Sequence, residues 1–304
     1  MKIGGRAEIA GGAAGSFEPV RPRLARIAYR MLGSVAESED VVQDIWLSWN
    51  AAEHTAIENA EAWLVAATTR RAIDRLRAAK VRREEYVGIW LPEPVLTDHG
   101  ASPEDVQELA GDVSVAFLLL LERLSPEARA AFLLREVFDI DYSEIAGTLG
   151  KSEAACRQLV HRAKDQLRDE RPRHAAPREA HLALMRRFAQ ALADGDFPAI
   201  RSLLAVDAEL SGDGGGKVTS FPKPMLGGQR IAQLFYASYL RYGAAVELRL
   251  THINGEWAFL RYIEGQLESA QTYVTDGEKI LGIHVQRNPD KLRRIEQGLQ
   301  GFAA

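Results

Sequence analysis

The chain has 304 residues, a formal net charge of −4 and a hydrophobic fraction of 46%. This composition is typical of a globular protein with two or three domains, and the charge excludes a generally basic nucleic-acid coat. The single cysteine, Cys156, excludes an internal disulfide and a cysteine-based metal cluster, and it favours a cytoplasmic protein. The apolar stretches are too short to predict a transmembrane helix.

The first block of the chain, residues 16–83, predicts three helices. The first begins with Leu24 and Ile27 and ends near Gly33, and Ser38 is the expected N-cap of the second. A polar loop, residues 52–59, precedes the third helix, which begins at about Ala60. From position 70 to position 83 that helix carries seven cations against one acid. A solvated helix face is the alternative, but the imbalance favours a polyanionic partner.

Residues 84–104 form a linker that contains the sequence WLPEP, at positions 90–94. Prolines end helices and push the preceding residue toward extended backbone. Trp90 and Leu91 should not remain in water, so they dock on a neighbouring domain, wait for a partner or form a local hydrophobic clip. The residues alone leave these alternatives open.

The second block, residues 105–172, ends in a predicted helix-turn-helix. Gly150 permits the tight turn, Ser152 is a good N-cap, and the second helix has a buried stripe that begins at Cys156. Basic side chains flank that stripe, from Arg157 to Arg168, as in a helix that enters the major groove. The alternative is an ordinary helical hairpin with a solvated basic face.

The third block, residues 177–295, predicts an α+β fold. Helices are expected over residues 178–193, after Phe197 and over residues 229–242, followed by strands over 245–253, 257–262, 269–275 and 279–286. Asp276-Gly277 indicates a hairpin between the last two strands. The glycine-rich segment at residues 211–217 is expected to be a loop. Helices followed by an antiparallel sheet indicate a cone.

Together these motifs resemble the extracytoplasmic-function group of the sigma-70 family of transcription initiation factors. Residues 38–46 (SEDVVQDIW) look like region 2.2, residues 62–64 and 72–77 like regions 2.3 and 2.4, and the helix-turn-helix like region 4. The third block is similar to the SnoaL-like (NTF2-like) fold. A subgroup joins these parts in this order and carries a WLPEP linker, a DGGGK loop and an NPDK motif, found here at positions 90–94, 213–217 and 288–291.

The resemblance implies core RNA polymerase and promoter DNA as partners, no cofactor or metal, and a monomer when free. It implies four groups of site residues. Core polymerase is contacted by Asp40, Gln43, Asp44 and Trp46, and the −10 element by Asn59, Trp63, Arg70, Arg71, Arg75 and Arg77. The −35 element is contacted by Arg157, Gln158, His161 and Arg162. The interdomain regulatory contact comprises Trp90, Leu91, Pro92, Glu93, Pro94, Asp213, Gly214, Gly215, Gly216, Lys217, Asn288, Pro289, Asp290 and Lys291.

The role of the third block has three possible interpretations. As an enzyme it would use Asp207, Asp213, His252 or His284, whose spacing marks no catalytic pair. It could also be a plain packing module. We expect it to be regulatory, docking on WLPEP through DGGGK, with Lys217 meeting Glu93 or Glu85; its cone could hold a small ligand. For the whole chain, the alternative function is a stand-alone DNA-binding repressor fused to a SnoaL-like enzyme.

Overall fold

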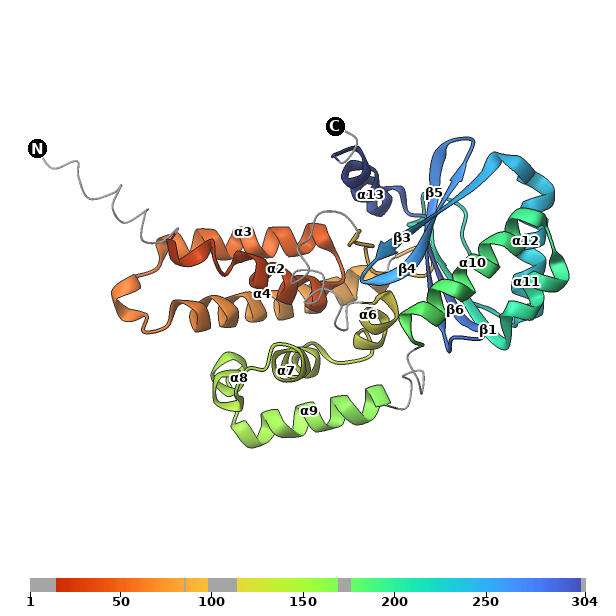
Figure 1. Cartoon of the computed structure of the whole chain (residues 1–304). Coiled ribbons are helices and arrows are strands. Elements are labelled where there is room, and N and C mark those ends of the chain that lie inside the picture. Colours follow the sequence, from red (N-terminus) through yellow and green to blue (C-terminus); the bar gives the residue numbers. More distant parts are fainter. Residues whose placement is uncertain (1–14, 85, 98–113, 169–175, 302–304) are drawn as a thin grey trace, which may run out of the picture. The chain divides into compact units, whose positions relative to one another are not determined.

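The computed structural model describes residues 15–84, 86–97, 114–168 and 176–301. The chain divides into two compact units, residues 1–84 with 120–170 and residues 85–119 with 171–304. We call them the helical unit and the cone unit, and each is described by itself (Figure 1). The expected start of the second block, at residue 105, lies outside the described residues.

The helical unit begins with α2 (Arg21–Leu32) and α3 (Val35–Ala51). Gly33 ends α2 in the left-handed conformation, as the sequence predicts. The N-cap of α3 was predicted wrongly. It is Ser34, whose hydroxyl accepts from the backbone N–H of Glu37, whereas Ser38 lies buried inside the helix and donates to the Ser34 carbonyl at 2.6 Å. Ser34 and Ser38 lie four residues apart, and either could cap a helix that begins here. Ser34 does so because it directly follows Gly33, which reverses the chain.

A short 3-10 helix, η1 (His54–Ala56), leads to α4 (Ala60–Glu84). Asn59 provides the start signal of α4, because its side-chain oxygen accepts from the backbone N–H of Ala62 at 3.0 Å. Leu64 and Ile73 are buried on the inner face of α4, whereas Arg70 and Arg77 are exposed. Arg70 and Arg77 of the basic run therefore lie on the outer side of a packed helix.

The helix α6 (Val115–Leu121) begins within the residues of the cone unit and ends at the start of the second part of the helical unit. That part contains α7 (Pro126–Glu136), α8 (Tyr142–Leu149) and α9 (Glu153–Arg168). The turn between α8 and α9 is the one predicted. Gly150 has φ 63°, and the Ser152 hydroxyl accepts from the backbone N–H of Ala155 at 3.2 Å. The predicted inner stripe of α9 is buried and consists of Cys156, Val160, Ala163 and Leu167. The two helices thus form a helix-turn-helix.

The cone unit is built on a six-stranded sheet in the order β2-β1-β6-β5-β4-β3. The strands are β1 (Leu204–Asp213), β2 (Met225–Leu226), β3 (Val246–Ile253), β4 (Glu256–Ile263), β5 (Gln266–Thr275) and β6 (Ile280–Gln286). The last four were predicted, but β1 and β2 were not. Residues 211–213, expected in a loop, belong to β1, which pairs in parallel with β6. The two paired strands are far apart in sequence, so no hairpin turn motif predicts their pairing.

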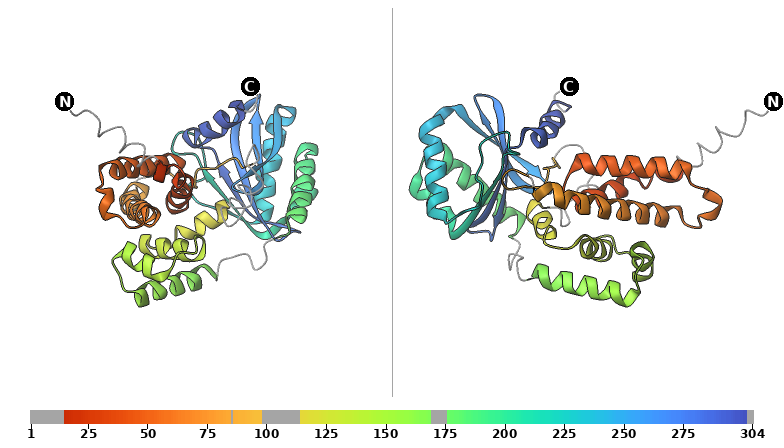
Figure 2. Two further views of the ribbon diagram at one scale, coloured as in Figure 1. Left: turned by 60° about the vertical axis from the view of Figure 1, so that its left-hand side comes forward. Right: turned by 180° about the vertical axis from the view of Figure 1, so that it is seen from behind.

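Helices cover both faces of this sheet (Figures 1 and 2). On one face, α10 (Arg178–Asp194), α11 (Phe197–Leu203) and α12 (Gly228–Tyr242) bury Phe188 and Ile231 against strand residues such as Phe259 and Tyr273. On the other, α13 (Pro289–Gly301) packs Leu292 and Ile295 against β3, β4 and β5. These helices and the sheet form the expected α+β cone.

Within the described residues, the helices are all too short or too polar to cross a membrane.

Candidate functional sites

The predicted polymerase-binding residues lie along one side of α3. Asp40 and Gln43 are exposed, Asp44 is partly exposed, and Trp46 is half-buried with its ring centroid 4.9 Å from that of Phe17. Leu47 continues this side, seven residues after Asp40, and is 61% exposed. The sequence analysis overlooked Leu47, although the spacing of Asp40, Gln43 and Asp44 predicts its position. The surface combines acids with an exposed apolar side chain.

A surface hollow of about 640 Å³ lies between η1 and the first turn of α4. It is lined by residues of the predicted loop, including Glu53, Ile57 and Asn59, and by Trp63. The Trp63 ring lies 5.3 Å from that of Trp49, which is buried and in turn contacts His54. A hollow with an aromatic wall that packs on a buried side chain can hold a nucleotide base that has left its stack.

The arginines of α4 lie next to the acids of α3. Arg71 donates to the Asp44 carboxylate at 2.7 Å and Arg75 donates to it at 3.2 Å. The Arg71 hydrogen bond holds the pKa of Asp44 below its usual value. Arg77 forms ion pairs with Asp74 and with Glu127 of α7. Arg75 also pairs with Asp40 at 3.8 Å, so the structure brings two predicted polymerase contacts and two predicted DNA contacts together in a single network.

On α9, Arg157, Gln158, His161 and Arg162 are all exposed and share one side of the helix. Arg157 donates to Glu153 at 2.7 Å, and its guanidinium lies 5.0 Å from the centre of the Tyr142 ring. His161 lies 3.2 Å from Asp165. These contacts hold the Arg157 and His161 side chains against the surface of α9. The exposed face of the helix is left accessible to a DNA groove.

In the cone unit, the linker lies against the sheet. Leu91 is 1% exposed, and its backbone N–H contacts Asp213 at the end of β1, so this part of the WLPEP segment is buried against the cone. Farther along, Leu96 bridges Ile253 at the end of β3, and the backbone N–H of Thr97 donates to His252 O at 3.0 Å. Asn254 extends this pairing, accepting from Val95 N through its side chain. The linker thus pairs with the end of the edge strand β3 through an isolated antiparallel β-bridge.

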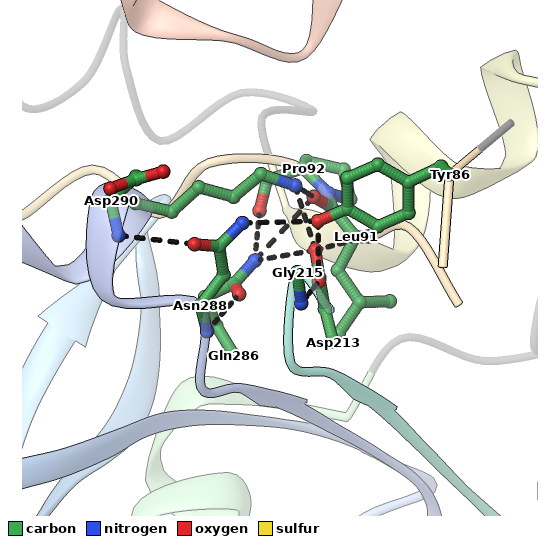
Figure 3. Close-up of polar contacts among 9 residues, drawn as sticks. Tyr86, Leu91, Pro92, Asp213, Gly215, Gln286, Asn288 and Asp290 are labelled. Atoms are coloured by element: carbon green, nitrogen blue, oxygen red, sulfur yellow. Dashed lines mark hydrogen bonds and ion pairs between the residues drawn. The ribbon is translucent and has the colours of Figure 1, made fainter. Parts of the chain in front are cut away.

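A buried carboxylate, Asp213, holds the linker from the cone side (Figure 3). Its oxygens accept from the backbone N–H of Leu91 at 3.0 Å, from the Tyr86 hydroxyl at 2.7 Å and from Lys291 Nζ at 2.7 Å. Burial, together with the hydrogen bond to Asp213, raises the pKa of Tyr86, so its hydroxyl stays protonated and donates. We call Tyr86, Asp213, Gln286, Asn288 and Lys291 the Asp213 cluster.

The NPDK and DGGGK motifs complete this cluster. Lys291 also donates to the Leu91 carbonyl at 2.6 Å, and its ammonium group lies 4.6 Å from the centre of the Trp90 ring. Asn288 Nδ2 donates to the Tyr86 hydroxyl at 3.0 Å. Gly215 donates its N–H to Asp213 at φ 63°, and a Cβ there would lie 2.3 Å from Asn288 Nδ2. Glycine is therefore required at this position on both counts.

For Lys217, the expected pairing with Glu93 was wrong, and the expected pairing with Glu85 stays a prediction. Lys217 Nζ pairs with Asp290, inside the cone, and Glu93 pairs with Arg294 of α13 at 3.0 Å. Glu85 lies outside the described residues. The two motifs do converge, but through the aspartate that opens DGGGK, because Asp213 ends a strand and points to the linker while Lys217 lies beyond the turn.

Three contributors to the cone site were missed by the sequence analysis. Tyr86 and Gln286 flank recognised motifs, and Gln286 Nε2 lies 3.3 Å from both the Pro92 carbonyl and Asp213. Arg294 lies one helical turn after Asp290. A search for polar residues within four positions of each motif would have found all three, but only the course of α13 shows that Arg294 reaches Glu93.

Comparison with known proteins identifies the class. Residues 17–82 match the family Sigma-70 region 2, and residues 114–167 match the family Sigma-70, region 4. The chain is 36% identical over 287 residues to an ECF RNA polymerase sigma factor of Mycobacterium tuberculosis, covering 90% of this chain and 91% of the relative. It therefore belongs to the ECF sigma factors, which bind core RNA polymerase and promoter DNA and direct transcription initiation.

That relative is SigJ. A crystal structure of Mycobacterium tuberculosis SigJ superposes with a TM-score of 0.73 at 33% identity, covering 92% of this chain and 98% of that one. A probable ECF sigma factor of the same species, SigI, is 28% identical over 287 residues, covering 92% of this chain and 95% of the relative. These likenesses confirm the expected family and fold class, and they decide against a stand-alone DNA-binding repressor.

Proposed function

We propose that the cone unit regulates this sigma factor by holding the linker between its two DNA-recognising regions. The observation that carries the proposal is Asp213, which has no exposed surface and binds the backbone of Leu91. Loss of one partner from a buried ion pair is costly, so the Asp213–Lys291 pair favours one fixed linker conformation. A fixed linker limits how far the regions before and after it can separate.

Promoter recognition is assigned to the two exposed basic surfaces of the helical unit. The hollow beside Trp63 is proposed to hold an unstacked −10 base, with Arg70, Arg71, Arg75 and Arg77 neutralising phosphates. Arg157, Gln158, His161 and Arg162 of α9 are proposed to contact the −35 element. Asp40, Gln43, Asp44 and Trp46, together with Leu47, are proposed to form the polymerase contact.

A catalytic role for the cone is not proposed. Of the four candidate residues, Asp213 has its carboxylate taken up by the linker, and Asp207 is exposed. His284 is buried, which lowers its pKa to about 4, and the His252 ring packs 3.6 Å from that of Trp257. The lining of the cone cavity contains none of these four residues. A general acid or base must reach its substrate, and these side chains do not share a site.

The remaining expectations follow from this role. We propose that the protein works in the cytoplasm, where core polymerase and promoter DNA are found, and that it is monomeric until it binds polymerase. The cone contains a cavity of about 700 Å³, large enough for the small ligand that the sequence analysis anticipated.

The regulatory proposal is tested by the full-length double variant Asp213→Asn/Lys291→Met, which releases the linker from the Asp213 cluster. In a purified system with core polymerase, run-off transcription is expected to differ at least threefold from wild type, because the linker is no longer fixed. Asp207→Asn, an exposed aspartate on the same strand, is the matched control. If the double variant keeps wild-type output and wild-type affinity for core polymerase, the regulatory proposal is wrong.

A further inference from the structure

The cone cavity lies between α10 and α12 on one side and β3, β4 and β5 on the other. Its walls are largely apolar and include Phe235, Leu248, Leu250 and Phe259. Two arginines, Arg186 and Arg261, are the charged residues of the lining, which contains no carboxylate. A cavity of this size and character suits an apolar molecule with a single anionic group.

Arg261 is positioned to receive that group. Its side chain is 12% exposed, and its guanidinium donates to Ser238 Oγ at 2.6 Å on the cavity wall and to Glu268 at 2.8 Å. Glu268 also pairs with Arg287, at 2.6 Å. One carboxylate therefore serves two guanidinium groups, and this three-residue set carries a net positive charge of one. A ligand carboxylate would balance it, whereas a neutral head group would not.

The same three residues lead from the cavity to the linker. The backbone N–H of Arg287 donates to the Asp213 carbonyl at 2.8 Å, and the Arg287 side chain donates to the Thr219 carbonyl. Arg287 directly follows Gln286, a member of the Asp213 cluster. Ion pairs thus connect Arg261 through Glu268 to Arg287, and the backbone of Arg287 contacts Asp213, the residue that binds Leu91.

We propose that the cone cavity binds a monocarboxylic acid with an apolar body, that Arg261 anchors the carboxylate, and that binding loosens the linker through Glu268 and Arg287. The ligand carboxylate competes with Glu268 for Arg261. Glu268 then loses one of its two cationic partners, and Arg287 loses a fixed position beside the Asp213 cluster. Such a chain supplies coupling because both sites bias the same set of ion pairs. The coupling half of this inference rests on the proposed regulatory role of the linker, but the binding half does not.

Calorimetric titration of the full-length protein with decanoate tests the binding site, and 1-decanol, which has the same chain without the charge, is the control ligand. Decanoate is expected to bind at least tenfold more tightly than 1-decanol. Arg261→Met should remove that difference, while Arg261→Lys should restore part of it. Arg187→Met, an exposed arginine on α10 outside the cavity lining, is the matched control and should bind decanoate as wild type does. Equal binding of the two ligands, or no binding of decanoate, overturns the proposed site.

Glu268→Gln separates binding from coupling. This variant frees Arg261 from its competitor, so decanoate should bind at least as tightly as to wild type. Hydrogen exchange of the Leu91 and Val95 amides, measured without polymerase or DNA, should speed up at least threefold on decanoate binding in wild type and not in Glu268→Gln. If decanoate binds with the expected variant pattern but linker exchange stays constant, the coupling is wrong and the site stands. Transcription assays of the Asp213→Asn/Lys291→Met variant then judge the regulatory proposal separately.

Discussion

Asp213 is a carboxylate with no exposed surface whose oxygens accept hydrogen bonds from the linker and from the cone itself. A buried charge is stable only when its hydrogen-bonding capacity is filled, and here the Tyr86 hydroxyl, the Leu91 amide and the Lys291 ammonium group fill it. Asp207 lies six residues earlier on the same strand and is exposed. The role of Asp213 therefore depends on its position in the fold as well as on its being an aspartate.

Asp213→Asn is expected to lower the free energy of unfolding of the cone unit by about 2–4 kcal/mol, because the Lys291 charge loses its partner in a buried site. Differential scanning calorimetry measures the loss, and exchange of the Leu91 amide should speed up at the same time. Asp207→Asn should leave both unchanged. A cone that unfolds at the wild-type temperature in the Asp213 variant would show that the cluster adds little stability.

Glu256 gives a pH dependence with a defined sign. Burial raises the pKa of Glu256 to about 7 from the usual 4.5, against the opposing effect of Arg178. The folded state thus favours the protonated acid, so its stabilising contribution is present below pH 4.5 and is lost as the pH rises through 7. Glu256→Gln should therefore raise the free energy of unfolding by about 1–2 kcal/mol at pH 8 and change it little at pH 5.

Calorimetry of wild type and Glu256→Gln at the two pH values checks this prediction. Glu278→Gln, at an exposed position, should show no such pH-dependent difference. A Glu256→Gln effect of equal size at pH 5 and pH 8 would contradict the assigned protonation.

At the scale of elements, α8 and α9 show how far local signals reach. The turn glycine, the serine cap and the four-residue spacing of the buried stripe all act within 17 residues, so the helix-turn-helix could be predicted in detail. By contrast, β1 was not predicted, and its last three residues, 211–213, were expected in a loop, because its parallel neighbour β6 is 67 residues or more away and glycines lie at its end. The strand that carries Asp213 is therefore one of the two strands that local patterns did not predict.

On α9, Arg157→Ala is expected to weaken binding to duplexes with a −35 element by about 1–3 kcal/mol while affecting duplexes without it less. The contacts with Glu153 and Tyr142 fix the position of the guanidinium group before DNA binds. The lost binding free energy therefore includes the benefit of this pre-organisation. Fluorescence anisotropy with the two duplexes, using polymerase holoenzyme, measures the difference. Equal losses on both duplexes would make Arg157 a phosphate contact.

At the scale of the molecule, buried polar side chains join parts of the chain that are remote in sequence. In the helical unit, Arg129 of α7 is 3% exposed and donates to the carbonyl of Met31, at the end of α2, at 2.6 Å and to Glu122 at 2.8 Å. Burial lowers the pKa of Arg129 to about 9, which leaves it charged near neutrality. Arg129 is thereby a buried cation that attaches the second sigma region to the first, beside the more exposed Arg77–Glu127 pair.

Arg129→Met should destabilise the helical unit by about 2–4 kcal/mol, because the Met31 carbonyl and Glu122 both lose a charged donor. Urea unfolding followed by circular dichroism measures this, with Arg168→Met, at an exposed position of α9, as control. We also expect a larger radius of gyration by small-angle scattering as the two regions separate. An unchanged unfolding midpoint would show that the Arg129 contacts add little to the stability of the helical unit.

The sequence by itself determined the helices of the two sigma regions, the helix-turn-helix, four of the six strands and the family, because these depend on local periodicity, caps and contiguous motifs. It also indicated that the WLPEP, DGGGK and NPDK motifs belong together. The tertiary structure decided how they meet. It chose Asp213 over Lys217 as the residue that holds the linker, recruited Tyr86 and Gln286, and aligned Arg261, Glu268 and Arg287 between the cavity and the linker. The Arg261–Glu268 pair joins neighbouring strands and is seven positions apart in sequence. The other contacts join residues 19 to 202 positions apart, and their distances are set by strand pairing and packing, which no local pattern encodes.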